Sequence, residues 1–134
     1  MYVDACAIVA LLADEPEAMR VADALTRTAS PITSPIAVLE AALALARPDK
    51  FDISVATAGA IVEEFLRERT ITVRDLPPAT ETSRLALDAA HRYRTGRRGL
   101  NLGDCLHYAC ARHYDVPILA TADEYRQTDL EVVD

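Results

Sequence analysis

Residues 1–18 read MYVDACAIVALLADEPEA. Met1 to Asp4 predicts a short apolar strand that ends on an acid. The run Asp14-Glu15-Pro16 then supplies a capping acid and a proline suited to the first turn of a helix. This first stretch therefore predicts a strand followed by a helix.

The same order recurs along the rest of the chain. Ser34-Pro35 repeats the helix-start chemistry directly after a β-branched segment. Alternating strands and helices without hairpin signals predict an α/β domain with a short, mainly parallel sheet of four to five strands covered on both faces. We expect a single domain over residues 1–134. Strands are predicted at 31–33, 70–73, 117–121 and 130–133, and helices at 36–46, 53–69, 78–93 and 101–113.

Composition bounds the function classes. No apolar run is long enough to span a bilayer, and the N-terminus carries an acid instead of a basic leader, so we expect no membrane association and no export. Three cysteines, an odd number, favour a reducing cytoplasm. The net charge of −7 argues against a protein that simply neutralises phosphates, unless the excess acid holds divalent cations.

Two acidic positions follow predicted strands. Asp4 ends the first strand, and Asp123 with Glu124 follows the strand at 117–121. The carboxyl ends of parallel strands meet at one edge of a sheet, where ligands bind. Helix capping is an equal alternative for Asp4, and loop solvation is the alternative for the later pair.

Two further acids lie on apolar helices. Glu40 is the sole charge between Ile36 and Ala46, which predicts a helix buried on all sides and a carboxylate in need of a cation, a partner or an outward path. Asp104 lies three residues after Asn101, which resembles a capping box, yet it begins a helix with an apolar core face. An exposed Glu40 and a purely capping Asp104 are the structural alternatives.

Taken together, the acids stand where a doubly wound sheet would gather them. Like charges need compensation, and carboxylate oxygens suit Mg²⁺ or Mn²⁺. Such an ion binds phosphate oxygens and activates water, so the predicted chemistry is hydrolysis of a phosphodiester.

The same residues resemble the PIN-domain ribonucleases, and within them the VapC-type toxins of bacterial toxin–antitoxin pairs. The resemblance covers nearly the whole chain. It is carried by the opening MYVDACAIVALLADEPEA, by TSPIAVLE at 33–40, by LNLGDC at 100–105 and by TADEY at 121–125. Cys6 departs from the family, which usually has Ser or Thr there, and a thiol is a weaker hydrogen-bond partner.

The resemblance implies a three-layer α/β/α fold and a Mg²⁺- or Mn²⁺-dependent endoribonuclease. It implies catalytic and metal-binding roles for Asp4, Glu40 (directly or through a water), Asp104 and Asp123, with Glu124 as the alternative to Asp123. Asn101 and Cys6 are supporting residues. It also implies a homodimer that is neutralised by a cognate VapB-type antitoxin, whose tail enters the acidic groove, often with an arginine.

Other signals are weaker. Arg92, Arg94, Arg97 and Arg98 surround Tyr93 and could grip RNA phosphates, with a solvated loop as the equal alternative. Cys105, His107, Cys110 and His113 invite a zinc interpretation, but they lie on one helix, and core packing explains them better.

Two rival functions remain from the sequence. A receiver-like signalling module would also cluster acids around Mg²⁺, but it needs a lysine after a late strand, and the only lysine is Lys50. A catalytically weakened PIN-fold module that binds RNA or protein is the second rival, with Cys6 as its best support.

Overall fold

A computed structural model describes residues 1–96 and 99–134. Four strands of two residues each form one sheet in the order β3-β2-β1-β4, and every pairing is parallel. The elements are β1 (Tyr2–Val3), α1 (Ala5–Leu12), α2 (Ala18–Thr26), β2 (Ile32–Thr33), α3 (Pro35–Ala46), α4 (Val55–Glu68), β3 (Thr72–Val73), α5 (Ala79–Tyr93), α6 (Leu102–His113), β4 (Ile118–Leu119) and the 3₁₀-helix η1 (Glu124–Gln127).

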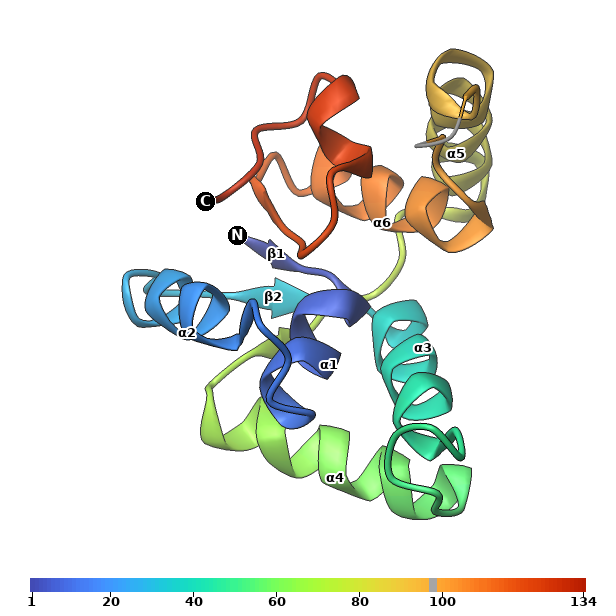
Figure 1. Ribbon diagram of the computed structural model, residues 1–134. Helices are drawn as coiled ribbons and strands as arrows, with labels where there is room; N and C mark the ends of the chain where they lie inside the picture. The colour runs from blue at the N-terminus through green and yellow to red at the C-terminus, as the bar shows by residue number, and fades with distance from the viewer. Residues whose placement is uncertain (97–98) are drawn as a thin grey trace.

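Helices cover both faces of the sheet, as the three-layer prediction requires (Figure 1). Successive strand residues point to opposite faces, so β1 and β4 each contribute one residue to each of two cores. Tyr2 and Ile118 pack with α5, α6 and η1, whereas Val3 and Leu119 pack with α1 to α4. The prediction of an α/β sandwich with a parallel sheet is confirmed.

The strand order places a switch point beside β1. The chain moves from β1 to β2 and β3 on one side, and β4 then pairs on the other side of β1. Such a reversal opens a crevice between the carboxyl ends of the two strands, where α/β proteins bind ligands. Asp4 follows β1 and Asp123 follows β4, so this crevice is where the predicted acids should meet.

Three details of the predicted elements are wrong. Residues 130–133 form no strand and contribute one parallel bridge between Val132 and Ile118. The helix expected at Asp14-Glu15-Pro16 begins at Ala18, because Asp14 has a positive φ of 51°. Helix α3 is not buried on all sides, since Leu39 and Leu43 are about half exposed.

No helix in the part of the chain that the structure describes is long and apolar enough to cross a membrane.

Candidate active site

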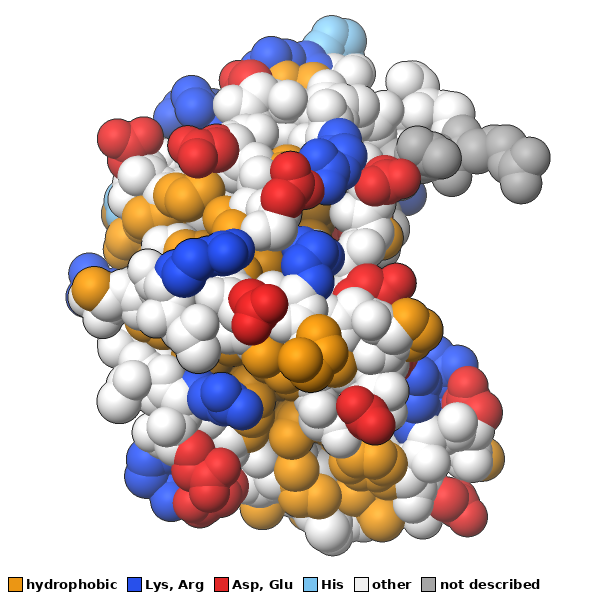
Figure 2. Space-filling model, turned by 60° about the vertical axis from the view of Figure 1, so that its left-hand side comes forward, with side chains coloured by type: hydrophobic (Ala, Val, Ile, Leu, Met, Phe, Trp, Pro, Cys, Tyr) orange, Lys and Arg blue, Asp and Glu red, His pale blue; other side chains and the backbone are white. Residues whose placement is uncertain are grey.

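Two adjoining cavities lie at the carboxyl edge of the sheet. The first, which we call the acid cavity, has a volume of about 470 Å³ and is lined by Asp4, Glu40, Asp104 and Glu124. The second, the side cavity, holds about 520 Å³ and shares Asp104 and Glu124 with the first. Figure 2 shows the molecule hollowed on one side, with acidic and basic side chains at the edge of the hollow.

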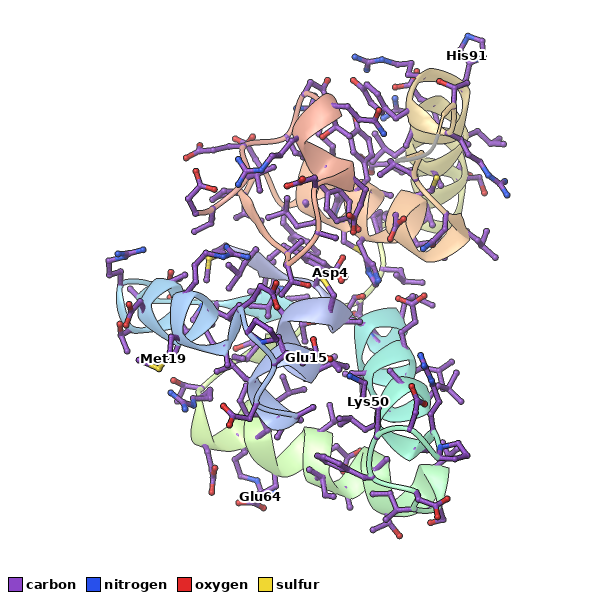
Figure 3. The ribbon with its side chains drawn as sticks, in the orientation of Figure 1. Asp4, Glu15, Met19, Lys50, Glu64 and His91 are labelled. Atoms are coloured by element: carbon purple, nitrogen blue, oxygen red, sulfur yellow. The ribbon has the colours of Figure 1, made fainter. Side chains whose placement is uncertain are left out.

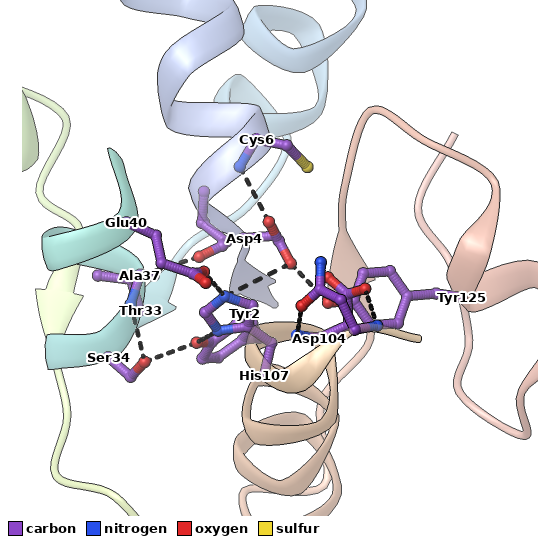
Figure 4. A network of polar contacts seen from close by, with 12 residues as sticks. Tyr2, Asp4, Cys6, Thr33, Ser34, Ala37, Glu40, Asp104, His107 and Tyr125 are labelled. Atoms are coloured by element: carbon purple, nitrogen blue, oxygen red, sulfur yellow. Dashed lines mark hydrogen bonds and ion pairs between the residues drawn. The ribbon is translucent and has the colours of Figure 1, made fainter. Parts of the chain in front are cut away.

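Asp4 is fixed at the centre of this edge by two donors. It caps α1, and its Oδ1 accepts a hydrogen bond from the backbone N–H of Cys6 at 2.9 Å. Its Oδ2 accepts from the buried hydroxyl of Tyr125 at 2.7 Å (Figure 4). Capping and a place in the acidic site were alternatives from the sequence, and the structure shows both.

Cys6 supports Asp4 through its backbone N–H. Its Sγ atom accepts a hydrogen bond from the backbone N–H of Thr121 at 3.2 Å, which ties α1 to the segment after β4. Burial, followed by the charge of Asp4, raises the pKa of this thiol. Cys6 is therefore a protonated structural contact between the two strand ends.

Asp104 begins α6 as part of a capping box. Its backbone N–H donates to Asn101 Oδ1 at 3.0 Å, and its Oδ2 accepts from the backbone N–H of Asn101 at 2.7 Å. The predicted capping box is confirmed. Burial raises the pKa of Asp104, as do the charges of Asp4 and Glu40, so the carboxylate has negative neighbours that its cap does not neutralise.

Glu40 reaches the site from α3 and is held by His107. The imidazole Nε2 lies 2.5 Å from Glu40 Oε2 and 4.0 Å from Asp4 Oδ2, while Nδ1 lies 2.8 Å from the hydroxyl of Tyr2. The Tyr2 hydroxyl in turn lies 2.7 Å from Ser34 Oγ (Figure 4). A buried polar chain thus runs from β1 and α3 to the carboxylate of Glu40.

His107 lies within reach of two of the acids, Glu40 and Asp4. Burial lowers the pKa of His107, but the charge of Asp4 and the hydrogen bond to Glu40 outweigh it, so the pKa is raised overall. Sequence reasoning assigned this histidine to core packing. The signal that could have found it is its spacing of three residues from Asp104, which puts both side chains on one face of α6.

Sequence reasoning also missed Gly103, which allows the carboxylate of Glu40 to pack close to the backbone of α6. A Cβ atom at Gly103 would lie 2.8 Å from Glu40 Cδ and closer still to Oε1. The carboxylate therefore packs directly on the glycine, because any other residue would place its Cβ atom in this space.

The two candidates for the last acid, Asp123 and Glu124, lie in different positions. Glu124 lines both cavities, whereas Asp123 lines the side cavity and is about half exposed, with Arg126 at 3.3 Å. Burial raises the pKa of Glu124, as do the charges of Asp104, Asp4 and Asp123. The geometry favours Glu124 as the acid that accompanies Asp4, Glu40 and Asp104.

The four acids that line the acid cavity offer the type of ligand that a hard divalent cation prefers. All four side chains offer carboxylate oxygens. Burial, and then the charges of the neighbouring acids, raise the pKa of Asp104 and Glu124, and a bound cation would offset the repulsion between these acids. Within residues 1–96 and 99–134, no three His, Cys, Asp or Glu side chains stand in an arrangement that could hold a metal ion as it is. The acids line the cavity, and Glu40 is drawn toward His107.

Of the predicted RNA-binding arginines, the two that the structure describes lie outside these cavities. Arg92 pairs with Asp88 at 3.2 Å and with Asp129 at 3.4 Å, and its guanidinium lies over the ring of Tyr93. Arg94 lines an apolar groove between α5 and α6. Arg97 and Arg98 lie outside the described residues. Neither Arg92 nor Arg94 lines the acid cavity or the side cavity.

Replacing Tyr125 by phenylalanine tests how far Asp4 depends on its second donor. The substitution keeps the buried ring and removes only the hydroxyl that holds Asp4 Oδ2. Loss of a group that orients a charged ligand typically costs about 10- to 100-fold in activity or metal affinity. We expect a loss in that range for RNA cleavage, measured at saturating Mn²⁺. Tyr114→Phe, whose hydroxyl donates to the backbone of Asp75, is the matched control and should cleave at the wild-type rate.

Comparison with known proteins agrees with this geometry. The model of the PIN domain family matches residues 1–130. Ribonuclease VapC36 of Mycobacterium tuberculosis is 37% identical, over 98% of this chain and 91% of the relative. VapC ribonuclease R02377 of Rhizobium meliloti is 30% identical, over 96% of this chain and 98% of the relative.

Two solved structures share the fold at 15% identity. Mycobacterium tuberculosis VapC20, described as a sarcin–ricin loop cleaving toxin, has a TM-score of 0.74. The match covers 96% of this chain and 95% of the VapC20 chain. FitAcB from Neisseria gonorrhoeae has a TM-score of 0.68, with coverages of 99% and 96%. These matches exclude the receiver-like alternative. The chain belongs to the PIN-domain family and, within it, to the VapC-type ribonuclease toxins.

Proposed function

We propose that the chain is a Mg²⁺- or Mn²⁺-dependent endoribonuclease that hydrolyses RNA phosphodiester bonds at the acid cavity. The observation that carries this proposal is that Asp4, Glu40, Asp104 and Glu124 reach one cavity from four separate elements. Four carboxylates with one histidine between them leave a net negative site. A site of this kind gains stability from a cation.

The chain's own residues have distinct roles in this proposal. Asp4 and Asp104 hold the cation, since each carboxylate is already oriented by backbone or phenol donors. Glu40 joins them or acts through an intervening water, and Glu124 supplies the fourth carboxylate, with Asp123 as the alternative. When bound, the cation lowers the pKa of a coordinated water and offsets the charge of the scissile phosphate.

His107 is a positioning residue in this scheme. Its ring holds Glu40 at the wall of the cavity, and Tyr2 and Ser34 hold the ring. Tyr2, Ser34 and His107 are buried, so the hydrogen bond from the His107 ring gives the partly exposed carboxylate of Glu40 a defined place before RNA binds. Preorganisation of this kind is what an acidic hydrolytic site requires.

The proposal extends to partners and location. As for the family that the chain belongs to, we propose a homodimer neutralised by a cognate VapB-type antitoxin that places a basic side chain in the acid cavity. The three cysteines are free thiols, which suits the reducing cytoplasm. Light scattering of the purified protein tests the dimer, and loss of cleavage on adding the antitoxin tests the inhibition.

Mapping of cleaved ends on total RNA tests the activity and identifies the substrate. The wild-type chain with Mn²⁺ should produce new ends at a small number of positions, and these should vanish in the presence of a chelator. Binding of RNA without any new ends would instead support the rival of a catalytically weakened module.

A further inference from the structure

One end of the acid cavity carries two cationic side chains that the proposed hydrolysis does not use. Beyond the four acids, it is lined by Glu15, Arg47, Asp49 and Lys50. Among the described residues that line the acid cavity and the side cavity, Arg47 and Lys50 are the positively charged ones. Both follow the C-terminal end of α3, and Glu40 lies within the same helix. Helix α3 therefore connects one of the acids to the two cations.

We propose that Arg47 and Lys50 form a phosphate subsite that binds the RNA backbone next to the cleaved bond. This inference rests on the proposed ribonuclease function. An RNA strand that enters this cavity meets several carboxylates, which repel its phosphates. The proposed divalent cation offsets this repulsion at the scissile phosphate, and Arg47 and Lys50 are placed to offset it at a neighbouring phosphate.

The turn that carries both cations is ordered by backbone hydrogen bonds. The backbone N–H groups of Lys50 and Asp52 both donate to the carbonyl of Arg47, at 3.0 and 3.1 Å, and that of Phe51 donates to Leu45 at 3.1 Å. The two side chains therefore start from fixed backbone positions. A subsite on an ordered turn costs less ordering on binding than one on a loose loop.

Glu15 keeps Lys50 at this end of the cavity. The two side chains form an ion pair, and each is only about one quarter exposed (26% and 27%). Figure 3 shows them next to each other between α1 and the turn after α3, on one side of Asp4. A lysine has a long flexible side chain, so without Glu15 it could turn toward the acids and occupy the place of the cation.

Both cations keep donors for a phosphate. The Lys50 ammonium has three N–H groups and one hydrogen bond to Glu15. Arg47 uses Nε and Nη2 on Asp49, at 3.0 and 2.5 Å, and its side chain is 59% exposed, so Nη1 remains for a ligand. This arrangement holds the cations in place and leaves one N–H face of each for the RNA.

Salt dependence of RNA binding tests the subsite. For a single strand, each phosphate contact contributes about 0.7 to the slope of log affinity against log salt. We expect Arg47→Gln to lower the magnitude of this slope by about 0.7. The double variant Glu15→Gln/Lys50→Gln should do the same without any change in net charge. Both should raise KM for a short RNA several-fold while kcat stays within about twofold.

Arg67→Gln is the matched control. Arg67 pairs with Glu64 on the exposed surface of α4 and lines neither cavity, yet its substitution changes net charge as Arg47→Gln does. Its slope and KM should equal those of the wild type. If the Arg47 variant and the double variant also keep the wild-type slope and KM, the subsite does not exist.

Failure of the proposed function gives a different result. If the wild type cleaves no RNA, fluorescence anisotropy of a labelled single-stranded RNA in Mg²⁺ still measures the slopes of the four proteins. Lower slopes for both cavity variants then support the subsite without the nuclease. If Lys50 acts through its positive charge alone, arginine can replace it. Lys50→Arg should therefore retain the wild-type slope, and a lower slope would contradict this role.

Discussion

Asp104→Asn should reduce RNA cleavage by more than about a hundredfold while leaving the fold intact. Mutation of a residue that only supports a metal ligand typically lowers activity or metal affinity by about 10- to 100-fold. Asp104 is proposed as a ligand itself, so its loss should lower activity further. The amide oxygen of asparagine can still accept from the backbone of Asn101, so the start of α6 is kept. Because burial and the charges of Asp4 and Glu40 raise the pKa of Asp104, its charge is unfavourable in the folded state, and its removal should not lower the free energy of unfolding. Initial rates and thermal unfolding measure the two effects.

Asp23→Asn is the control for this experiment. Asp23 is an exposed acid on α2 and lines neither cavity, so the variant should cleave at the wild-type rate. Asp4→Asn should also inactivate, but its amide would meet the Tyr125 hydroxyl and Cys6 N–H donors, so Asp104 gives the cleaner comparison. Wild-type cleavage by a folded Asp104→Asn protein would remove this carboxylate from the mechanism.

Gly103→Ala should impair activity without destabilising the protein. Its new Cβ would occupy the place of the Glu40 carboxylate, which is the flexible end of a side chain and can move aside. Alanine is favoured over glycine in a helix by up to about 1 kcal/mol, which offsets the cost of weakening the hydrogen bond between Glu40 and His107, so the free energy of unfolding should change little. A displacement of about 1 Å at a reacting group can cost on the order of a hundredfold. We expect a loss of about 10- to 100-fold in cleavage rate.

The chain offers a matched glycine for comparison. Gly59 lies within α4, and a Cβ there would meet nothing within 4 Å. Gly59→Ala should gain the same helix propensity and keep full activity. Equal activity of the two alanine variants would show that the contact between Gly103 and Glu40 has no functional role.

The fold could be predicted because its signals are local. Strand–helix alternation and helix-start residues such as Ser34-Pro35 gave the layers and the parallel sheet, and Ser34 does cap α3. The start of α2 was misplaced because Asp14 adopts a positive φ, which acidic residues tolerate and which a capping pattern does not reveal. The exposure of Leu39 and Leu43 depends on which faces of α3 other helices cover, and apolar composition alone does not specify this.

The acids could be located from the sequence, but their partners could not. Asp4 and Asp104 stand at strand and helix ends, where periodicity and capping patterns single them out. His107 and Gly103 look like ordinary members of an apolar helix, and their roles depend on Glu40 arriving from α3, a tertiary contact. Arg47 and Lys50 belong to a short turn, and only the fold brings that turn to the acid cavity.

The rate of cleavage of one defined single-stranded RNA, in EDTA and then with increasing Mn²⁺, tests the central claim most directly. We expect no cleavage in EDTA and a saturable return of activity with Mn²⁺ in the wild type, but not in Asp104→Asn. Cleavage that persists unchanged in EDTA would contradict a metal-dependent site formed by these carboxylates.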